Sequence, residues 1–186
     1  MTLEAVAIGL ALAYVLLTMG QSRLCWIAAF ISAVIYLYIF ANVKLYMEAG
    51  LQLVYAGMAV VGWAFWGRDR SDETLPVTTR PLRFHLSTII GILLMAGIVG
   101  SLLTTYTDAA RPYIDSMTTL AAVAATWMVT QKILENWLYW FVINTVSVWL
   151  FIDRGLNPTA ALFALYILLS VIGYFVWRKT LLAHES

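Results

Sequence analysis

Long apolar runs, separated by short polar or charged stretches, make up almost all of this 186-residue chain. A helix needs about 20 mostly apolar residues to cross a bilayer, with a usual range of roughly 17–25. Nothing in the runs alternates as the strands of a membrane barrel do. The pattern predicts an all-α integral membrane protein with seven transmembrane helices, of which the fifth and sixth are short: Leu3–Met19, Leu24–Val43, Ala49–Gly67, Leu86–Thr104, Ser116–Gln131, Trp137–Ile152 and Leu156–Trp177.

The composition supports a membrane protein. Hydrophobic residues make up 62% of the chain and charged residues 11%, against about 45–50% and about 25% in soluble domains. The net charge of +1 provides no basic surface to attract nucleic acid. The single Cys25 leaves neither an intrachain disulfide nor a cysteine-based metal site, and no cofactor is indicated. Met1–Glu4 lacks a positively charged start, so we expect no cleavable signal peptide.

Lys and Arg are unevenly distributed between the two ends of the predicted helices. The side of the membrane that holds the N-terminus has three of them, and the opposite side has the other eight, including Arg23, Lys132, Arg178 and Lys179. Cytoplasmic loops carry the excess of positive charge. The sequence therefore predicts an N-terminus outside, a C-terminus in the cytoplasm, and a cytoplasmic linker over residues 68–85.

The third and seventh runs match at a constant offset of 111 residues. The shared pattern is Tyr-x6-Gly-[Trp/Tyr]-x2-Trp, which pairs Tyr55 with Tyr166, Gly62 with Gly173, Trp63 with Tyr174 and Trp66 with Trp177. The second and sixth runs match more loosely, as aromatic stretches that begin near Trp26 and Trp140. Aromatic belts at the membrane interface would explain the tryptophans, but they explain the Tyr-x6-Gly spacing poorly.

This repeat predicts one membrane domain, residues 1–186, in a parallel 3+1+3 arrangement. Repeat one covers residues 3–67, a linking helix covers 86–104, and repeat two covers 114–178. The odd helix between the repeats gives both halves the same direction in the membrane. Parallel repeats of this kind occur in transporters, where the substrate lies near the midplane.

Polar and aromatic side chains form a stripe along one face of several predicted helices. Asn144 lies in the middle of its run, where an amide needs partners, so we predict that it binds substrate. The other candidates for substrate binding are Trp137, Trp140, Gln52, Tyr55, Trp127, Thr126, Tyr166 and Ser147. Packing between helices is the alternative for the hydroxyl residues and for Gly62 and Gly173, and Trp137 is equally suited to anchor a helix at the interface.

The chemistry of these stripes favours a flat heteroaromatic solute that is neutral or singly cationic. Aromatic rings stack on heterocycles and attract cations, while amides and hydroxyls bind the edges of rings and sugars. A phosphorylated solute fits poorly because no Lys or Arg lies at mid-membrane. The absence of mid-helix carboxylates argues against proton or Na⁺ coupling. A membrane enzyme would need a nucleophile, metal cluster or acid–base pair that the sequence does not show; a receptor would not need polar stripes on both halves.

Two stretches of the chain resemble the PnuC family of bacterial vitamin transporters. The first is Glu135–Ser147, with the core Trp-x2-Trp-x3-Asn at Trp137, Trp140 and Asn144, and the second is Tyr46–Trp66. The resemblance extends from the first run to Trp177. Thr126 stands where many riboside carriers have Gln, which leaves the vitamin open.

The resemblance implies uptake of nicotinamide riboside, with thiamine or riboflavin as alternatives within the family. It implies uncoupled facilitated diffusion in the bacterial inner membrane, followed by trapping by a cytoplasmic vitamin kinase. It also implies a helical bundle similar to that of the SWEET sugar carriers, a homotrimer, and a substrate site that includes Trp137, Trp140 and Asn144.

Overall fold

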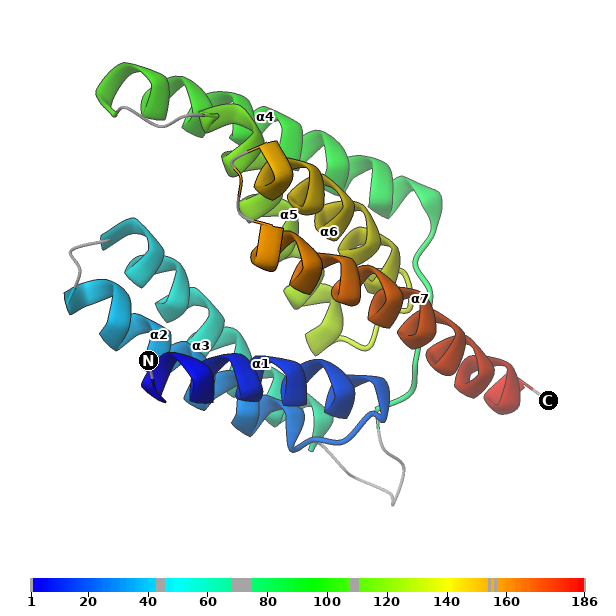
Figure 1. Ribbon diagram of the computed structural model, residues 1–186. Coiled ribbons are helices and arrows are strands. Elements are labelled where there is room, and N and C mark those ends of the chain that lie inside the picture. The colour runs from blue at the N-terminus through cyan, green and yellow to red at the C-terminus, as the bar shows by residue number, and fades with distance from the viewer. Residues whose placement is uncertain are drawn as a thin grey trace. The chain divides into compact units, whose positions relative to one another are not determined.

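The computed structural model describes residues 2–42, 46–67, 75–107, 111–153, 155 and 157–185, and these form seven helices (Figure 1). The predicted all-α fold is confirmed. The helices are α1 (Thr2–Met19), α2 (Cys25–Asn42), α3 (Tyr46–Trp66), α4 (Leu82–Tyr106), α5 (Pro112–Thr130), α6 (Asn136–Asp153) and α7 (Asn157–Glu185).

Length and apolar composition make four of the described helices able to cross a membrane. These are α2, α4, the Ala49–Trp66 part of α3 and the Thr159–Ala183 part of α7. A shorter apolar helix covers Ala5–Met19 in α1. The helices α5 and α6 are not among these four, and they contain most of the predicted substrate contacts.

The helix α4 begins four residues earlier than the sequence suggested. Residues 82–85 were expected in the linker, but the chain becomes helical directly after Pro81, which has an extended backbone (ψ of 155°) and occupies the N-cap position. The Phe84 N–H donates to the Pro81 carbonyl at 2.9 Å and closes the first turn. Residues 68–74 of the predicted linker lie outside the part of the chain that the structure describes.

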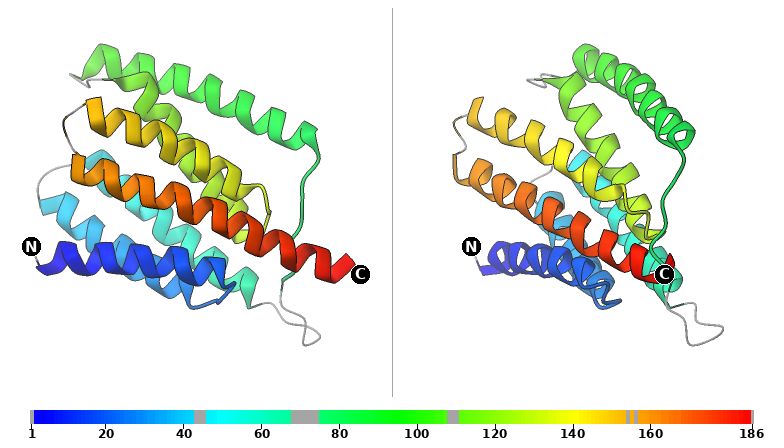
Figure 2. Two further views of the ribbon diagram at one scale, coloured as in Figure 1. Left: turned by 45° about the vertical axis from the view of Figure 1, so that its right-hand side comes forward. Right: turned by 90° about the vertical axis from the view of Figure 1, so that its right-hand side faces the viewer.

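The chain forms two compact units, which are described separately. Unit 1 consists of Met1–Val77, Val129–Lys132 and Phe175–Ser186, and unit 2 consists of Thr78–Met128 and Ile133–Tyr174. In unit 1, α2 packs against both α1 and α3, and the three helices lie side by side (Figure 2). The centre of their packing is aromatic, because the Trp26 ring meets the Trp66 ring edge-on at 5.5 Å.

Unit 2 contains α4, α6 and most of α5 and α7. Gly100 of α4 leaves room for the Tyr113 ring of α5, since a Cβ at this glycine would overlap that ring. At the other end of α4, His85 is hydrogen-bonded to the Tyr139 hydroxyl of α6 at 3.2 Å. The backbone N–H of Arg80 donates to Glu135 Oε1 at 3.2 Å and fixes the segment before α4.

The offset of 111 residues recurs in the backbone hydrogen bonds. Gln21 N–H donates to Thr18 O at 3.0 Å after α1, and Lys132 N–H donates to Val129 O at 3.0 Å after α5. Both residues have a positive φ, 54° at Gln21 and 48° at Lys132. The turn from α1 to α2 therefore has the same construction as the turn from α5 to α6.

The same offset relates two contacts between a tryptophan and a glycine. The Trp26 ring lies on Gly62 in unit 1, and the Trp137 ring lies on Gly173 in unit 2. A Cβ added at either glycine would overlap the ring. The counterpart of Trp26 is therefore Trp137, one helical turn before the Trp140 that the sequence suggested.

Candidate functional site

A hydrogen bond between α6 and α7 lies at the centre of the candidate site in unit 2. Asn144 Nδ2 donates to Ser170 Oγ at 3.3 Å, and the Ser170 hydroxyl donates to the Tyr166 carbonyl at 2.7 Å. Asn144 is 4% exposed and Ser170 is 3% exposed. A buried amide requires such partners because an unpaired one costs about 1–3 kcal/mol. The structure thus gives the predicted Asn144 a specific, buried position.

Trp140 and Thr126 belong to the packing between α5 and α6. The half-buried Trp140 ring packs against the cluster of Ala122, Ala125 and Ile143. Thr126 is buried, and its hydroxyl donates to the Ala122 carbonyl of its own helix at 2.8 Å. Small alanine side chains on α5 leave space for the indole of Trp140, so α5 determines where this ring can lie.

The remaining candidates in unit 2 differ in their surroundings. Ser147 is buried one turn beyond Asn144 on the same face of α6. Tyr166 is half-buried and meets the Phe163 ring edge-on at 5.8 Å. Trp137 is buried against Gly173, as Trp26 is against Gly62, which indicates a role in helix packing. Trp127 is 46% exposed, so the structure does not place it among the buried candidates.

Gln52 and Tyr55 lie one turn apart on α3, in unit 1. Both side chains are half-buried. The side chain of Glu48, one turn before Gln52, lies outside the described part of the structure. Gln52 and Tyr55 therefore remain predicted substrate contacts.

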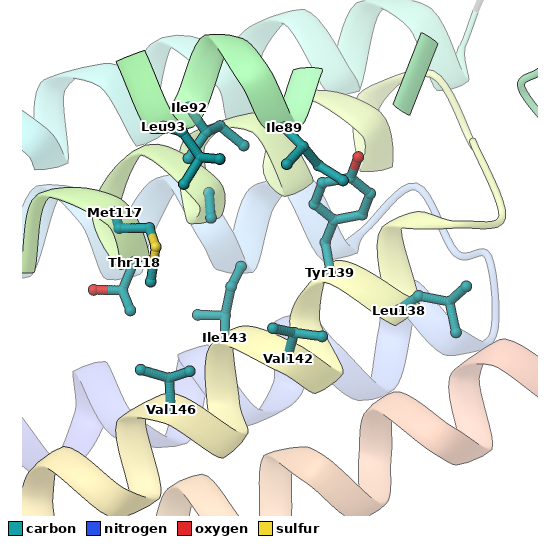
Figure 3. A pocket seen from close by; sticks show the side chains of 11 residues that line it. Ile89, Ile92, Leu93, Met117, Thr118, Leu138, Tyr139, Val142, Ile143 and Val146 are labelled. Carbon is teal, nitrogen blue, oxygen red and sulfur yellow. The ribbon is translucent and has the colours of Figure 1, made fainter. Parts of the chain in front are cut away.

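An apolar pocket lies beside α6 (Figure 3). Helical spacing places the α6 residues that line it on the face opposite Asn144. Its volume is about 360 Å³, and almost its whole wall is carbon. Ile89 and Leu93 of α4 face Tyr139 and Ile143 of α6 across it. A polar vitamin would lose its hydrogen bonds to water there and gain none. The polar face of α6, with Asn144 and Ser147, is therefore the better candidate for substrate.

The side chains gathered on that polar face are uncharged. Asn144 offers an amide donor and acceptor, Ser147 and Ser170 offer hydroxyls, and Trp140 offers an aromatic face. Such groups can orient a flat ring and bind a carboxamide or ribose hydroxyl. No general acid, nucleophile or charge pair is among them, so the arrangement suits binding rather than bond breaking.

A second buried polar group lies in unit 1, where α1 and α5 end. Lys132 is 2% exposed, and its Nζ donates to Gln21 Oε1 at 3.2 Å. The ammonium also lies 4.6 Å from the centre of the Trp66 ring. Gln21 Nε2 in turn donates to Thr180 Oγ1 at 3.0 Å. The sequence predicts Lys132 only as a charge in a cytoplasmic loop and gives no sign of its burial.

The burial of Lys132 predicts a pH dependence of stability. Burial lowers the pKa of Lys132 to about 8, and the charge interaction with Cys25, which raises this pKa, is the smaller effect. In the unfolded chain the pKa of a lysine is about 10.4. Between these values the unfolded chain binds more protons, so stability rises with pH and is constant, for this group, below about pH 8. We expect Lys132→Gln to reduce the rise in melting temperature from pH 8 to pH 10, measured in detergent. Equal slopes in both proteins would contradict this.

Comparison with known proteins relates the chain to membrane transporters. The family described as nicotinamide mononucleotide transporter matches residues 1–179. The nicotinamide riboside transporter PnuC of Neisseria mucosa is 27% identical over 173 residues, which cover 84% of this chain and 64% of that protein. The PnuC of Escherichia coli is 24% identical over 165 residues, 75% of this chain and 69% of that protein. The chain thus spans slightly less than two thirds of the Neisseria protein.

A solved structure has the same fold. The crystal structure of the vitamin B3 transporter PnuC superposes with a TM-score of 0.78, covering 98% of this chain and 83% of that one. The sequence identity is 22%. At this identity, the likeness shows that the two proteins share the arrangement of their helices.

Proposed function

Because the chain belongs to the nicotinamide mononucleotide transporter family, a family of transporters rather than enzymes, we propose that it carries nicotinamide riboside across the bacterial inner membrane. The observation that carries this proposal is the buried, uncharged pair of Asn144 and Ser170 beside Trp140 in unit 2. In this proposal Trp140 stacks on the pyridinium ring and Asn144 binds the carboxamide or ribose.

The riboside is a better candidate than its phosphorylated form. A phosphate requires Arg or Lys at short range, and the side chains described on the polar face with Asn144, namely Trp140, Ser147 and Ser170, are uncharged. The curated relatives are described as riboside transporters, which favours nicotinamide riboside over thiamine or riboflavin. We therefore assign the unphosphorylated vitamin as substrate.

Facilitated diffusion without ion coupling is the proposed mechanism. The Asp and Glu residues in the part of the chain that the structure describes lie near the ends of helices or just outside them, away from the middle of any helix. A proton or Na⁺ site at mid-membrane would need such a group. Net uptake would then require a cytoplasmic kinase to trap the vitamin by phosphorylation.

The proposal also includes the orientation and the oligomeric state of the protein. The N-terminus lies outside and the C-terminus in the cytoplasm, which labelling of each terminus with a reagent that does not cross the membrane would test. The protein forms a homotrimer, which light scattering would test.

Uptake into proteoliposomes tests the proposed function. Labelled nicotinamide riboside is expected to enter until its inside and outside concentrations are equal, with no response to an imposed pH or Na⁺ gradient. Nicotinamide mononucleotide, thiamine and riboflavin are the comparison solutes. Entry of thiamine or riboflavin without the riboside would reassign the substrate, and accumulation of unmodified riboside above equality would overturn the uncoupled mechanism.

The Trp140 ring supplies a separate prediction. Trp140→Ala removes the stacking surface and is expected to weaken riboside binding by about 1–3 kcal/mol, the usual value for stacking of a base on an aromatic side chain. Trp140→Phe keeps an aromatic face and is expected to lose less. Binding is measured by isothermal titration in detergent. Equal losses in the two variants would indicate that Trp140 acts only in packing against Ala122 and Ala125.

A further inference from the structure

Two tryptophans in unit 1 make reciprocal hydrogen bonds. Trp66 Nε1 donates to Val129 O at 3.2 Å, and Trp177 Nε1 donates to Thr18 O at 3.0 Å. Trp66 and Trp177 are related by the offset of 111, and so are Thr18 and Val129. Each acceptor is a carbonyl in the last turn of a helix, and it also accepts the backbone N–H of the turn residue that follows, Gln21 or Lys132. This exchange is the pattern that a two-fold axis produces.

Gln21 and Lys132 are equivalent positions that lie close to this axis. They are also related by 111 residues, and they meet each other through the bond from Lys132 Nζ to Gln21 Oε1. The bond from Gln21 to Thr180 adds the end of α7 to the group. One hydrogen-bonded chain thus ties together the turn after α1, the turn after α5 and the last part of α7.

The backbone at both positions is one that glycine adopts more easily. A φ near +50° is the usual conformation of the residue that ends a helix, and glycine is preferred there because other residues are strained. Gln21 and Lys132 adopt this strained backbone although each of them carries a Cβ. Strained positions held by polar residues indicate that the side chains are needed.

Lys132 also makes this closed arrangement easy to open. The bond that its ammonium makes to a neutral amide, with the Trp66 face beside it, compensates only part of the cost of burying a charge. Water would solvate the ammonium fully if the segments separated. The closed and open arrangements are therefore closer in free energy than a purely apolar contact would allow.

We propose that Gln21, Lys132 and Thr180 form a latch that closes this end of unit 1 and opens once in each transport cycle. The latch makes Gln21 and Lys132 gating residues, which act on transport without touching the substrate. This inference rests on the proposed transport function.

Cys25 provides a built-in reporter of the latch. It is the single cysteine of the sequence, it is fully buried at the start of α2, and it lies within electrostatic reach of Lys132. When the latch is closed, a thiol reagent cannot reach it. The rate at which N-ethylmaleimide labels Cys25 in the purified protein therefore measures how often this end opens.

Glycine and exchange variants separate a latch from a simple turn. Gln21→Gly and Lys132→Gly relieve the backbone strain but remove the side chains, and we expect labelling of Cys25 to accelerate roughly two- to tenfold, the value of one net hydrogen bond. Gln21→Lys places two ammonium groups together and is expected to label fastest. The double variant Gln21→Lys/Lys132→Gln exchanges donor and acceptor across the axis and is expected to return labelling toward the wild-type rate.

Riboside uptake by the same variants distinguishes failure of the latch from failure of the proposed function. Unchanged labelling in the glycine and Gln21→Lys variants, with each protein monodisperse on size exclusion, overturns the latch even if riboside uptake is normal. Faster labelling without rescue by the double variant also overturns it, since loss of packing alone would explain that result. If the wild type takes up no riboside while labelling follows the expected order, the proposed substrate is wrong and the latch stands.

Discussion

Gly62→Ala and Gly173→Ala are each expected to lower the stability of the folded protein by about 1–3 kcal/mol, and more if the helices cannot move apart. The reason is steric, because the added methyl group would occupy the volume of the Trp26 or Trp137 indole. Neither ring can swing aside, since both are almost fully buried. Thermal unfolding in detergent, followed by the fraction that remains monodisperse on size exclusion, measures the loss.

Gly57→Ala is the matched control for these variants. Gly57 lies on α3, as Gly62 does, but no atom lies within 4 Å of the position of its Cβ. Alanine in the middle of a helix is favoured over glycine by up to about 1 kcal/mol. We therefore expect Gly57→Ala to be neutral or stabilising. A melting temperature lowered equally by Gly57→Ala and Gly62→Ala would show that helix packing at Trp26 is not the cause.

Asn144→Ala is expected to weaken riboside binding about five- to 150-fold, which corresponds to about 1–3 kcal/mol for a buried hydrogen-bonding group left unpaired. The loss has two sources. The ligand loses a donor and an acceptor, and Ser170 loses the amide that bonds to it. Titration of riboside onto the purified variant, compared with initial uptake rates in proteoliposomes, measures binding and transport separately.

Thr145→Ala provides the control beside Asn144. Thr145 is exposed, and its hydroxyl bonds only within its own helix, to the Phe141 carbonyl at 2.7 Å. We expect the Thr145→Ala variant to bind and take up riboside as the wild type does. Ser170→Ala and the double variant with Asn144→Ala complete a double-mutant cycle. Additive losses would show that the two residues contribute to binding independently, and full affinity in Asn144→Ala would remove Asn144 from the substrate site.

The hydropathy pattern was sufficient to predict the helices because partition into a bilayer depends on local composition. It could not predict how the helices pair. The offset of 111 was visible at Gly62 and Gly173, but the sequence matched Trp26 to Trp140, since one helical turn separates Trp140 from Trp137 and both are tryptophans. Only the contact of each ring with a glycine in another helix identifies the correct partner.

The candidate site was predictable to a similar degree. Asn144 stood out because an amide in the middle of an apolar run is costly, and the structure places it in a buried bond. Its partner Ser170 was one of several hydroxyl residues at helical spacing, and spacing alone does not say which hydroxyl lies within 3.5 Å. Lys132 was counted among the cytoplasmic charges, because position in the sequence carries no information about contacts with distant residues such as Gln21 and Trp66.

The exchanged indole bonds of Trp66 and Trp177 have a consequence for the origin of the chain. A protein made of one half alone would need a second copy to provide each missing carbonyl, which is the arrangement of a symmetric dimer. In such a dimer the two positions on the axis must hold the same residue, and two lysines there would repel each other. Fusion into one polypeptide removes that restriction, so that one position holds the donor Lys132 and the other the acceptor Gln21.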